Sequence, residues 1–183
     1  MREVLVPLAE GCEELEAVTI IDLLRRARLN VTTASLAEGP VRCSRGTVLL
    51  ADRTLADVMD QDFDLIVLPG GLPGADHLNA DPRIHQLIDR QAKQNRHIAA
   101  ICAAPKVLVT NGALNGRKLT AFPGALDALD TSKVNITDKP VEIDGKVITS
   151  RGPGTAMDFA LQLIETLLGK AAREQVETPL QRP

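Results

Sequence analysis

Residues 97–105 read His97-Ile98-Ala99-Ala100-Ile101-Cys102-Ala103-Ala104-Pro105. A short apolar run ends at a cysteine, which predicts a buried strand whose last residue is the thiol and a helix that opens directly after it. A side chain on such a turn lies at the carboxyl end of a sheet, where open α/β sheets bind ligands. The positive end of the helix dipole favours thiolate over thiol. Cys102 is therefore a candidate nucleophile, with simple packing of a buried thiol as the alternative.

Strand and helix patterns alternate on both sides of this segment. The predicted strands are 4–8, 30–36, 65–68 and 118–122, in addition to the strand that ends at Cys102. Two hairpins are predicted within 41–51 and 134–148. The predicted helices are 13–28, 82–94, the helix that follows Cys102 and ends near residue 111, and 155–169. The tail after Ala172 is polar and ends in proline, so its terminus is predicted to be loose. This order predicts one doubly wound α/β domain, residues 1–183, with a mostly parallel sheet covered on both faces.

The composition is that of an ordinary globular protein, with 183 residues and a net charge of −3. The only aromatic residues are Phe63, Phe122 and Phe159, so neither charge nor base stacking favours a nucleic acid partner. No apolar run is long enough for a membrane helix, and the start does not resemble a secretory signal, so we expect a cytoplasmic protein. Three cysteines without CxxC spacing predict neither a disulfide framework nor a metal cluster.

An acidic run, Glu13-Glu14-Leu15-Glu16, opens the first predicted helix. Glu13 and Glu14 are explained by the helix macrodipole, which favours acidic residues in the first turn. Leu15 and Glu16 lie where this helix passes the end of the first strand. The side chain of one of them can therefore face the cleft at that end of the sheet. A protonated Glu16 there would donate a hydrogen bond to a thiolate without adding a repulsive charge.

Glycine-rich turns follow two other strands. Residues 68–74, Leu68-Pro69-Gly70-Gly71-Leu72-Pro73-Gly74, indicate a tight turn, or a place where a glycine N–H reaches an oxyanion. Their spacing matches neither a P-loop nor a dinucleotide fingerprint. Residues 151–155, Arg151-Gly152-Pro153-Gly154-Thr155, indicate a helix start with a weak signal for anion binding.

The three histidines offer no partner for Cys102. His97 begins the cysteine strand and so lies at its opposite end, because a strand rises about 3.3 Å per residue. His77 and His85 fall in a loop and on a helix, where solvated positions are expected. The missing Cys-His pair argues against ordinary cysteine hydrolysis.

Five stretches, in order along almost the whole chain, resemble the ThiJ/PfpI superfamily in its DJ-one/YajL-like branch. They are Glu13-Glu14-Leu15-Glu16-Ala17-Val18, Cys43-Ser44-Arg45, Val67-Leu68-Pro69-Gly70-Gly71, Ala99-Ala100-Ile101-Cys102-Ala103-Ala104-Pro105 and Thr149-Ser150-Arg151-Gly152-Pro153-Gly154-Thr155. The resemblance implies a flavodoxin-like (Rossmann-like) three-layer sandwich that forms a homodimer.

The resemblance also implies roles for single residues. Cys102 matches a reactive cysteine in a strained nucleophile elbow, and Glu16 matches the protonated glutamate that hydrogen-bonds it. Gly71 and Ala103 match the positions whose backbone N–H groups form an oxyanion pocket. Four further residues match positions in the pocket wall or near a bound anion: Gly70, Arg45, Pro153 and Phe122, with Arg45 also near the dimer interface.

Three residues depart from patterns in that superfamily. Ala103 stands where the protease-like and chaperone-like branches have a histidine, which argues against peptidase or amidotransferase activity. Phe122 replaces a pocket histidine, as in YajL-like proteins, which weakens any proton shuttle that needs that histidine. Cys12 has no cysteine counterpart in the DJ-one branch, and is interpreted either as a resolving thiol for Cys102 or as an incidental thiol.

Two functions remain open on this basis. The first is a cofactor-independent enzyme in which Cys102 and Glu16 act on small aldehydes such as methylglyoxal, or on their early adducts with macromolecules, in a glyoxalase III-like or deglycase-like reaction. The second is an oxidative-stress sensor, or a covalent redox chaperone, that uses the same cysteine on oxidants or oxidised proteins. A flavodoxin-type cofactor is not expected, because no phosphate loop or ring-stacking aromatic is evident.

Overall fold

A seven-stranded sheet forms the centre of the computed structural model, which describes residues 1–183, and its strand order is β10-β11-β7-β6-β1-β2-β5. The strands are β1 (Glu3–Leu8), β2 (Asn30–Ser35), β5 (Arg53–Thr54), β6 (Leu65–Leu68), β7 (His97–Ile101), β10 (Val141–Asp144) and β11 (Val147–Ser150). All neighbours pair parallel except β10 and β11, which form an antiparallel hairpin. The predicted mostly parallel sheet is confirmed.

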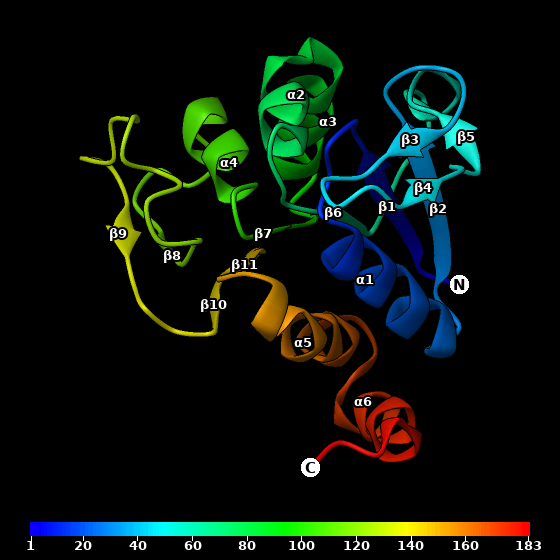
Figure 1. Cartoon of the computed structure of the whole chain (residues 1–183). Helices are drawn as coiled ribbons and strands as arrows, with labels where there is room; N and C mark the ends of the chain where they lie inside the picture. The colour runs from blue at the N-terminus through cyan, green and yellow to red at the C-terminus, as the bar shows by residue number, and fades with distance from the viewer.

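Helices cover both faces of this sheet (Figure 1). One face carries α1 (Glu14–Arg26), α5 (Ala156–Leu168) and α6 (Lys170–Glu177), and the other carries α2 (Gly74–Ala80), α3 (Pro82–Lys93) and α4 (Pro105–Asn111). Successive strand side chains point to opposite faces, so Val4 and Val6 join the core with α1 and α5, whereas Leu5 joins the core with α3. Two apolar cores therefore hold a three-layer α/β fold.

The remaining elements are short. They are the antiparallel hairpin of β3 (Val41–Arg42) and β4 (Val48–Leu49), the parallel pair of β8 (Lys118–Leu119) and β9 (Asn135–Ile136), and the 3-10 turns η1 (Ala56–Val58), η2 (Pro153–Thr155) and η3 (Thr178–Leu180). The predicted strand 118–122 ends early. The N–H of Thr120 donates to the hydroxyl of Thr149, and that of Phe122 donates to the carbonyl of Cys102, so these residues pair with no strand.

The tail after Ala172 includes part of a helix that the sequence pattern does not predict. Residues 170–177 form α6, and Val176 is buried in the core beneath α1 and α5. Arg173 of α6 forms an ion pair with Glu165 of α5, which links the two helices, and a second ion pair with Glu177 within α6. A single buried valine among polar residues is too weak a periodic signal to indicate this helix from the sequence.

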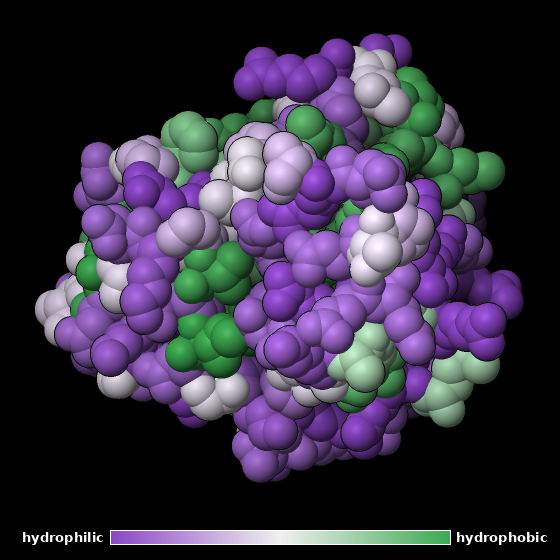
Figure 2. All heavy atoms as spheres, turned by 90° about the horizontal axis from the view of Figure 1, so that it is seen from below, coloured by the Kyte–Doolittle hydropathy of each residue, from purple (hydrophilic) through white to green (hydrophobic).

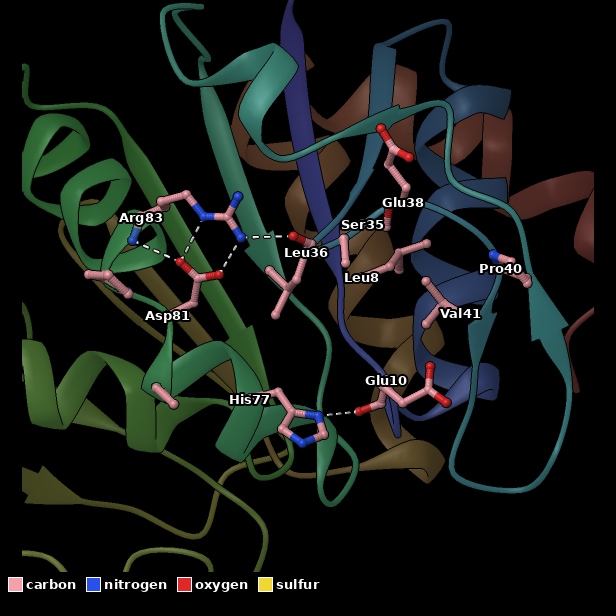
Figure 3. Close-up of a pocket in the computed structure, with 13 residues that line it drawn as sticks. Leu8, Glu10, Ser35, Leu36, Glu38, Pro40, Val41, His77, Asp81 and Arg83 are labelled. Carbon is pink, nitrogen blue, oxygen red and sulfur yellow. Dashed lines mark hydrogen bonds and ion pairs between the residues drawn. The ribbon is translucent and has the colours of Figure 1, made fainter.

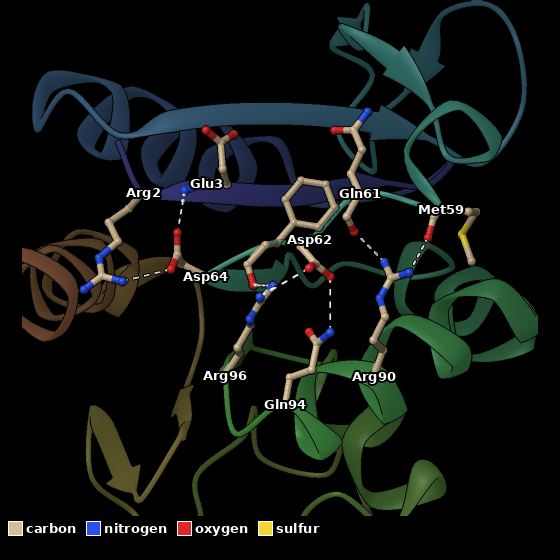
Figure 4. Close-up of polar contacts among 10 residues, drawn as sticks. Arg2, Glu3, Met59, Gln61, Asp62, Asp64, Arg90, Gln94 and Arg96 are labelled. Atoms are coloured by element: carbon tan, nitrogen blue, oxygen red, sulfur yellow. Dashed lines mark hydrogen bonds and ion pairs between the residues drawn. The ribbon is translucent and has the colours of Figure 1, made fainter.

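Polar contacts tie down the amino ends of β1, β6 and β7 (Figure 4). Asp64 accepts hydrogen bonds from the backbone N–H of Glu3 at 2.8 Å and from the guanidinium of Arg2 at 2.9 Å. Arg96 pairs with Asp62 and also donates to the carbonyl of Phe63. Because these groups are satisfied by one another, this edge serves to hold the sheet, and chemistry is to be sought at the carboxyl edge.

The face that carries α5 and α6 is mostly hydrophilic, with separate apolar spots rather than one continuous patch (Figure 2). No helix combines the length and the hydrophobicity that crossing a bilayer requires.

Candidate active site around Cys102

Cys102 is the first residue after β7, at the carboxyl edge of the sheet. Its N–H donates to the carbonyl of Ser150 at 2.9 Å, which continues the pairing of β7 with β11 for one residue. Its φ of 65° is left-handed, a conformation that costs about 1–3 kcal/mol for a residue with a side chain. The predicted helix begins only at Pro105, so residues 102–104 form a turn that presents the thiol. Cys102 is 8% exposed.

Glu16 lies in the first turn of α1 and is completely buried, whereas its neighbour Leu15 is exposed. The side chain of Glu13 caps the helix by accepting a hydrogen bond from the N–H of Glu16 at 2.8 Å. The backbone N–H of Gly70 donates to Glu16 Oε2 at 2.8 Å, and Oε1 is buried without a hydrogen-bond partner. The carboxyl is close enough to the Cys102 thiol for each group to shift the pKa of the other.

Gly70 and Gly71 let the backbone approach the Cys102 and Glu16 side chains closely. A Cβ on Gly70 would lie 2.5 Å from Cβ of Cys102 and 2.7 Å from Oε2 of Glu16. Gly71 has a φ of 89°, and a Cβ there would lie 2.4 Å from the backbone N of Glu13. The backbone N–H groups of Gly71 and Ala103 donate to the Cys102 sulfur and lower its pKa. Donors so placed can also reach an oxyanion on a carbon bonded to that sulfur.

Burial sets the protonation of the pair. It raises the pKa of Glu16 to about 7, against the hydrogen bonds from Cys102 and Gly70. Burial first, and then the charge and hydrogen bonding of Glu16, raise the pKa of Cys102 to about 12. The expected fall of the thiol pKa below its ordinary value is therefore wrong while Glu16 is ionised. The pair shares one proton above about pH 7, and a thiolate forms as its proton moves to Glu16.

The other predicted pocket residues divide into two groups. Phe122 lines a surface hollow of about 370 Å³ together with Pro153 and Arg151. The N–H of Phe122 donates to the carbonyl of Cys102 at 2.8 Å, so one wall of this hollow is bonded to the backbone of Cys102, although Cys102 itself does not line it. Arg45 is exposed, and only its backbone N–H is bound, to the carboxylate of Glu14. The structure thus gives no contact between the Arg45 guanidinium and Cys102.

Sequence reasoning missed two features near this site. Glu13 was assigned only to the helix dipole, yet its charge contributes to raising the pKa of Glu16. Cys12 lies against Cys43, with the sulfurs 3.6 Å apart, and not as a partner of Cys102. No spacing rule pairs Cys12 with Cys43, because they are joined only by the fold.

Figure 3 shows the largest of the cavities described, which has a volume of about 650 Å³ and is not lined by Cys102. It lies beyond the ends of β1 and β2, against α2 and α3. Its Arg83 is held by Asp81 and by the carbonyl of Leu36, and the ring Nδ1 of His77 bonds the carbonyl of Glu10. These polar groups bond to one another, and none of the predicted site residues lines this cavity. The strained cysteine remains the better site for chemistry.

Comparisons with known proteins show which family of proteins the chain resembles. A model of the DJ-1/PfpI family matches residues 2–166. The chain is 43% identical over 176 residues to Protein dj-1beta of Drosophila melanogaster, covering 96% of this chain and 94% of that protein. It is 37% identical to the Glutathione-independent glyoxalase DJR-1.2 of Caenorhabditis elegans, covering 93% and 91% of the two chains.

Solved structures show the same likeness. Drosophila melanogaster DJ-1beta superposes with a TM-score of 0.95 at 41% identity, over 100% of this chain and 98% of that one. Toxoplasma gondii DJ-1, described as oxidized, superposes with a TM-score of 0.93 at 38% identity, over 98% of both chains. The chain spans less than half the length of two Arabidopsis thaliana relatives, the DJ-1 homologs A and B, to which it is 41% and 42% identical over 98% of its own length.

Proposed function

The chain belongs to the DJ-1/PfpI family, and we propose that within it the protein converts small α-oxoaldehydes to hydroxy acids through Cys102 and Glu16. The observation that carries this proposal is the buried Glu16 carboxyl against a thiol that also faces two backbone N–H groups. A relative of 37% identity that is named a glutathione-independent glyoxalase supports it.

The proposed reaction is redox-neutral overall. The Cys102 sulfur attacks the aldehyde carbon while Glu16 takes the thiol proton, and a C–S bond forms as the carbonyl electrons move to oxygen. Gly71 and Ala103 stabilise that oxyanion. Glu16 passes its proton to that oxyanion, and then carries the proton on the former aldehyde carbon to the neighbouring ketone carbon while the hydroxyl proton moves to the ketone oxygen, which gives a hydroxy-acid thioester. Water cleaves the C–S bond, and the thiol is restored. Early adducts of the same aldehydes on macromolecules would enter by the same attack.

Replacing Cys102 by alanine should abolish lactate formation from methylglyoxal, because the other two thiols, Cys12 and Cys43, contact each other and not Glu16. The measurement is lactate formed over time by wild type and Cys102→Ala. Cys43→Ala serves as the matched control and should keep the wild-type rate, since that thiol contacts Cys12 instead. Equal rates for wild type and Cys102→Ala, or a wild-type rate no better than that of a free thiol, would exclude this reaction.

A second candidate function, oxidant sensing at the same cysteine, is favoured by the surroundings of the sulfur. Two N–H donors and a carboxyl that can be protonated would hold the oxygens of a sulfinate. The relative described as oxidized is consistent with oxidation chemistry in the family. A covalent redox chaperone would use the same sulfur for disulfide exchange with oxidised proteins.

Under mild peroxide, the sensing function predicts that Cys102 gains two oxygens before either other thiol is modified. Cys102 is the most exposed of the three, because Cys43 is 4% exposed and Cys12 is fully buried. Peptide mass spectrometry over a series of peroxide doses measures the order. Modification of Cys12 or Cys43 before Cys102 would rule out a sensor at Cys102.

A further inference from the structure

Two cysteines outside the candidate active site are in direct contact. The sulfurs of Cys12 and Cys43 lie 3.6 Å apart, and both side chains are buried. Cys12 belongs to the turn between β1 and α1, and Cys43 follows β3, so 31 positions of sequence separate them. Neither thiol takes part in the chemistry proposed for Cys102.

The backbone around these cysteines is already aligned for a covalent bond. The N–H of Gly11 donates to the carbonyl of Arg42 at 2.8 Å, and the N–H of Ser44 donates to the carbonyl of Cys12 at 2.8 Å. Hydrogen-bonded neighbouring chains lie about 4.7–4.9 Å apart, which is within the roughly 4.4–6.8 Å that disulfides span between Cα atoms. An S–S bond is about 2.05 Å long, so the two sulfurs need to approach by about 1.5 Å.

We propose that Cys12 and Cys43 form a reversible disulfide, a redox modification site separate from Cys102, with small hydroperoxides as the oxidant. One thiol reduces the O–O bond, which releases an alcohol or water and leaves a sulfenic acid. The other thiol displaces that oxygen as water, and the S–S bond forms. The two thiols together lose two electrons and two protons, and the hydroperoxide takes them up.

Burial assigns the order of these two steps. Cys43 is 4% exposed and is followed by the half-buried Ser44 and the exposed Arg45, so oxidant reaches Cys43 first and Cys12 resolves it. Burial raises the pKa of both thiols, which slows the first step relative to an exposed cysteine. The second step is intramolecular between atoms already in contact, so the sulfenic acid does not persist. The bond would link the turn before α1 to the loop after β3.

The test uses the full chain carrying Cys102→Ala, in which Cys12 and Cys43 are the only thiols. The folded protein is treated with increasing hydrogen peroxide, and remaining thiols are alkylated after denaturation. We expect the protein to lose about 2 Da and both alkylatable thiols together, and dithiothreitol to restore them. Trypsin should release the tripeptide Cys43-Ser44-Arg45 joined to the peptide Glu3–Arg25, because arginines precede and end both segments.

Two matched variants complete the test. With Cys12→Ala or Cys43→Ala added, the 2 Da loss should vanish and the remaining thiol should gain oxygen. The proposal is overturned if the chain with both cysteines gains only oxygen atoms on single sulfurs, or forms the bond solely when peroxide is added to denatured protein. The proposal is also overturned if both thiols stay unmodified at ten times the peroxide dose that fully oxidises Cys102 in the wild-type protein.

Discussion

Replacing Glu16 by glutamine should lower the rate at which iodoacetamide alkylates Cys102 at pH 7 by about 100-fold, the lower range of a positioned general base. Glutamine keeps the size of the side chain and an oxygen for the N–H of Gly70, but its amide cannot accept the thiol proton. The buried sulfur would then ionise on its own, against the desolvation that raises its pKa.

The pH dependence identifies the mechanism behind that loss. Below pH 7 both groups of the wild-type pair hold their protons, so the thiol is inert. Because the pKa of Glu16 is raised to about 7, deprotonation of the pair near that pH should bring the alkylation rate up to a plateau. In Glu16→Gln this step should disappear, and the rate should rise only above the ordinary thiol range.

Controls separate this effect from loss of structure. Glu38→Gln changes an exposed glutamate that makes no hydrogen bond, and it should keep the wild-type profile. Glu16→Asp retains a carboxyl and should restore part of the step near pH 7. A wild-type profile with a single midpoint near 8.5, unchanged in Glu16→Gln, would show that Glu16 does not take the thiol proton.

The sequence predicts those parts of the molecule that depend on local pattern. The run from His97 to Cys102 and the apolar spacing of α1 and α5 indicate strand and helices directly, and the parallel sheet follows from their alternation. The turn at residues 69–71 is likewise predicted by Gly70 and Gly71. Each of these signals lies within a few residues of the feature that it predicts.

Features that depend on distant contacts were not accessible in this way. Residues 120–122 continue the predicted strand, but the N–H of Thr120 bonds to the side chain of Thr149 and that of Phe122 bonds to the turn residue Cys102, so no backbone pairing with a strand forms there. The contact of Cys12 with Cys43 arises from two loops that meet only in the fold. The pKa of Cys102 depends on how deeply the turn is buried, which overrides the helix dipole that the sequence makes visible.

Gly70→Ala should add a methyl group that clashes with both Cys102 and Glu16. The new Cβ would lie 2.5 Å from Cβ of Cys102, 2.7 Å from Glu16 Oε2 and 2.8 Å from the carbonyl oxygen of Ile101. Relief requires the β6 turn to move away from α1 and β7, which also removes the hydrogen bond from the N–H of Gly70 to Glu16. We expect alkylation of Cys102 to slow by about 100-fold or more, because this displacement separates the base from the thiol.

The same change should lower the free energy of unfolding by about 1–3 kcal/mol, the usual cost of overpacking a tight interior. Gly154→Ala is the matched control, because a Cβ there meets nothing within 4 Å. It should leave stability within about 0.5 kcal/mol and keep the alkylation rate. Urea unfolding and the rate of iodoacetamide reaction measure both effects. If Gly70→Ala reacts as fast as Gly154→Ala, then close approach of Gly70 does not position the Cys102–Glu16 pair, and the proton transfer assigned to that contact must be abandoned.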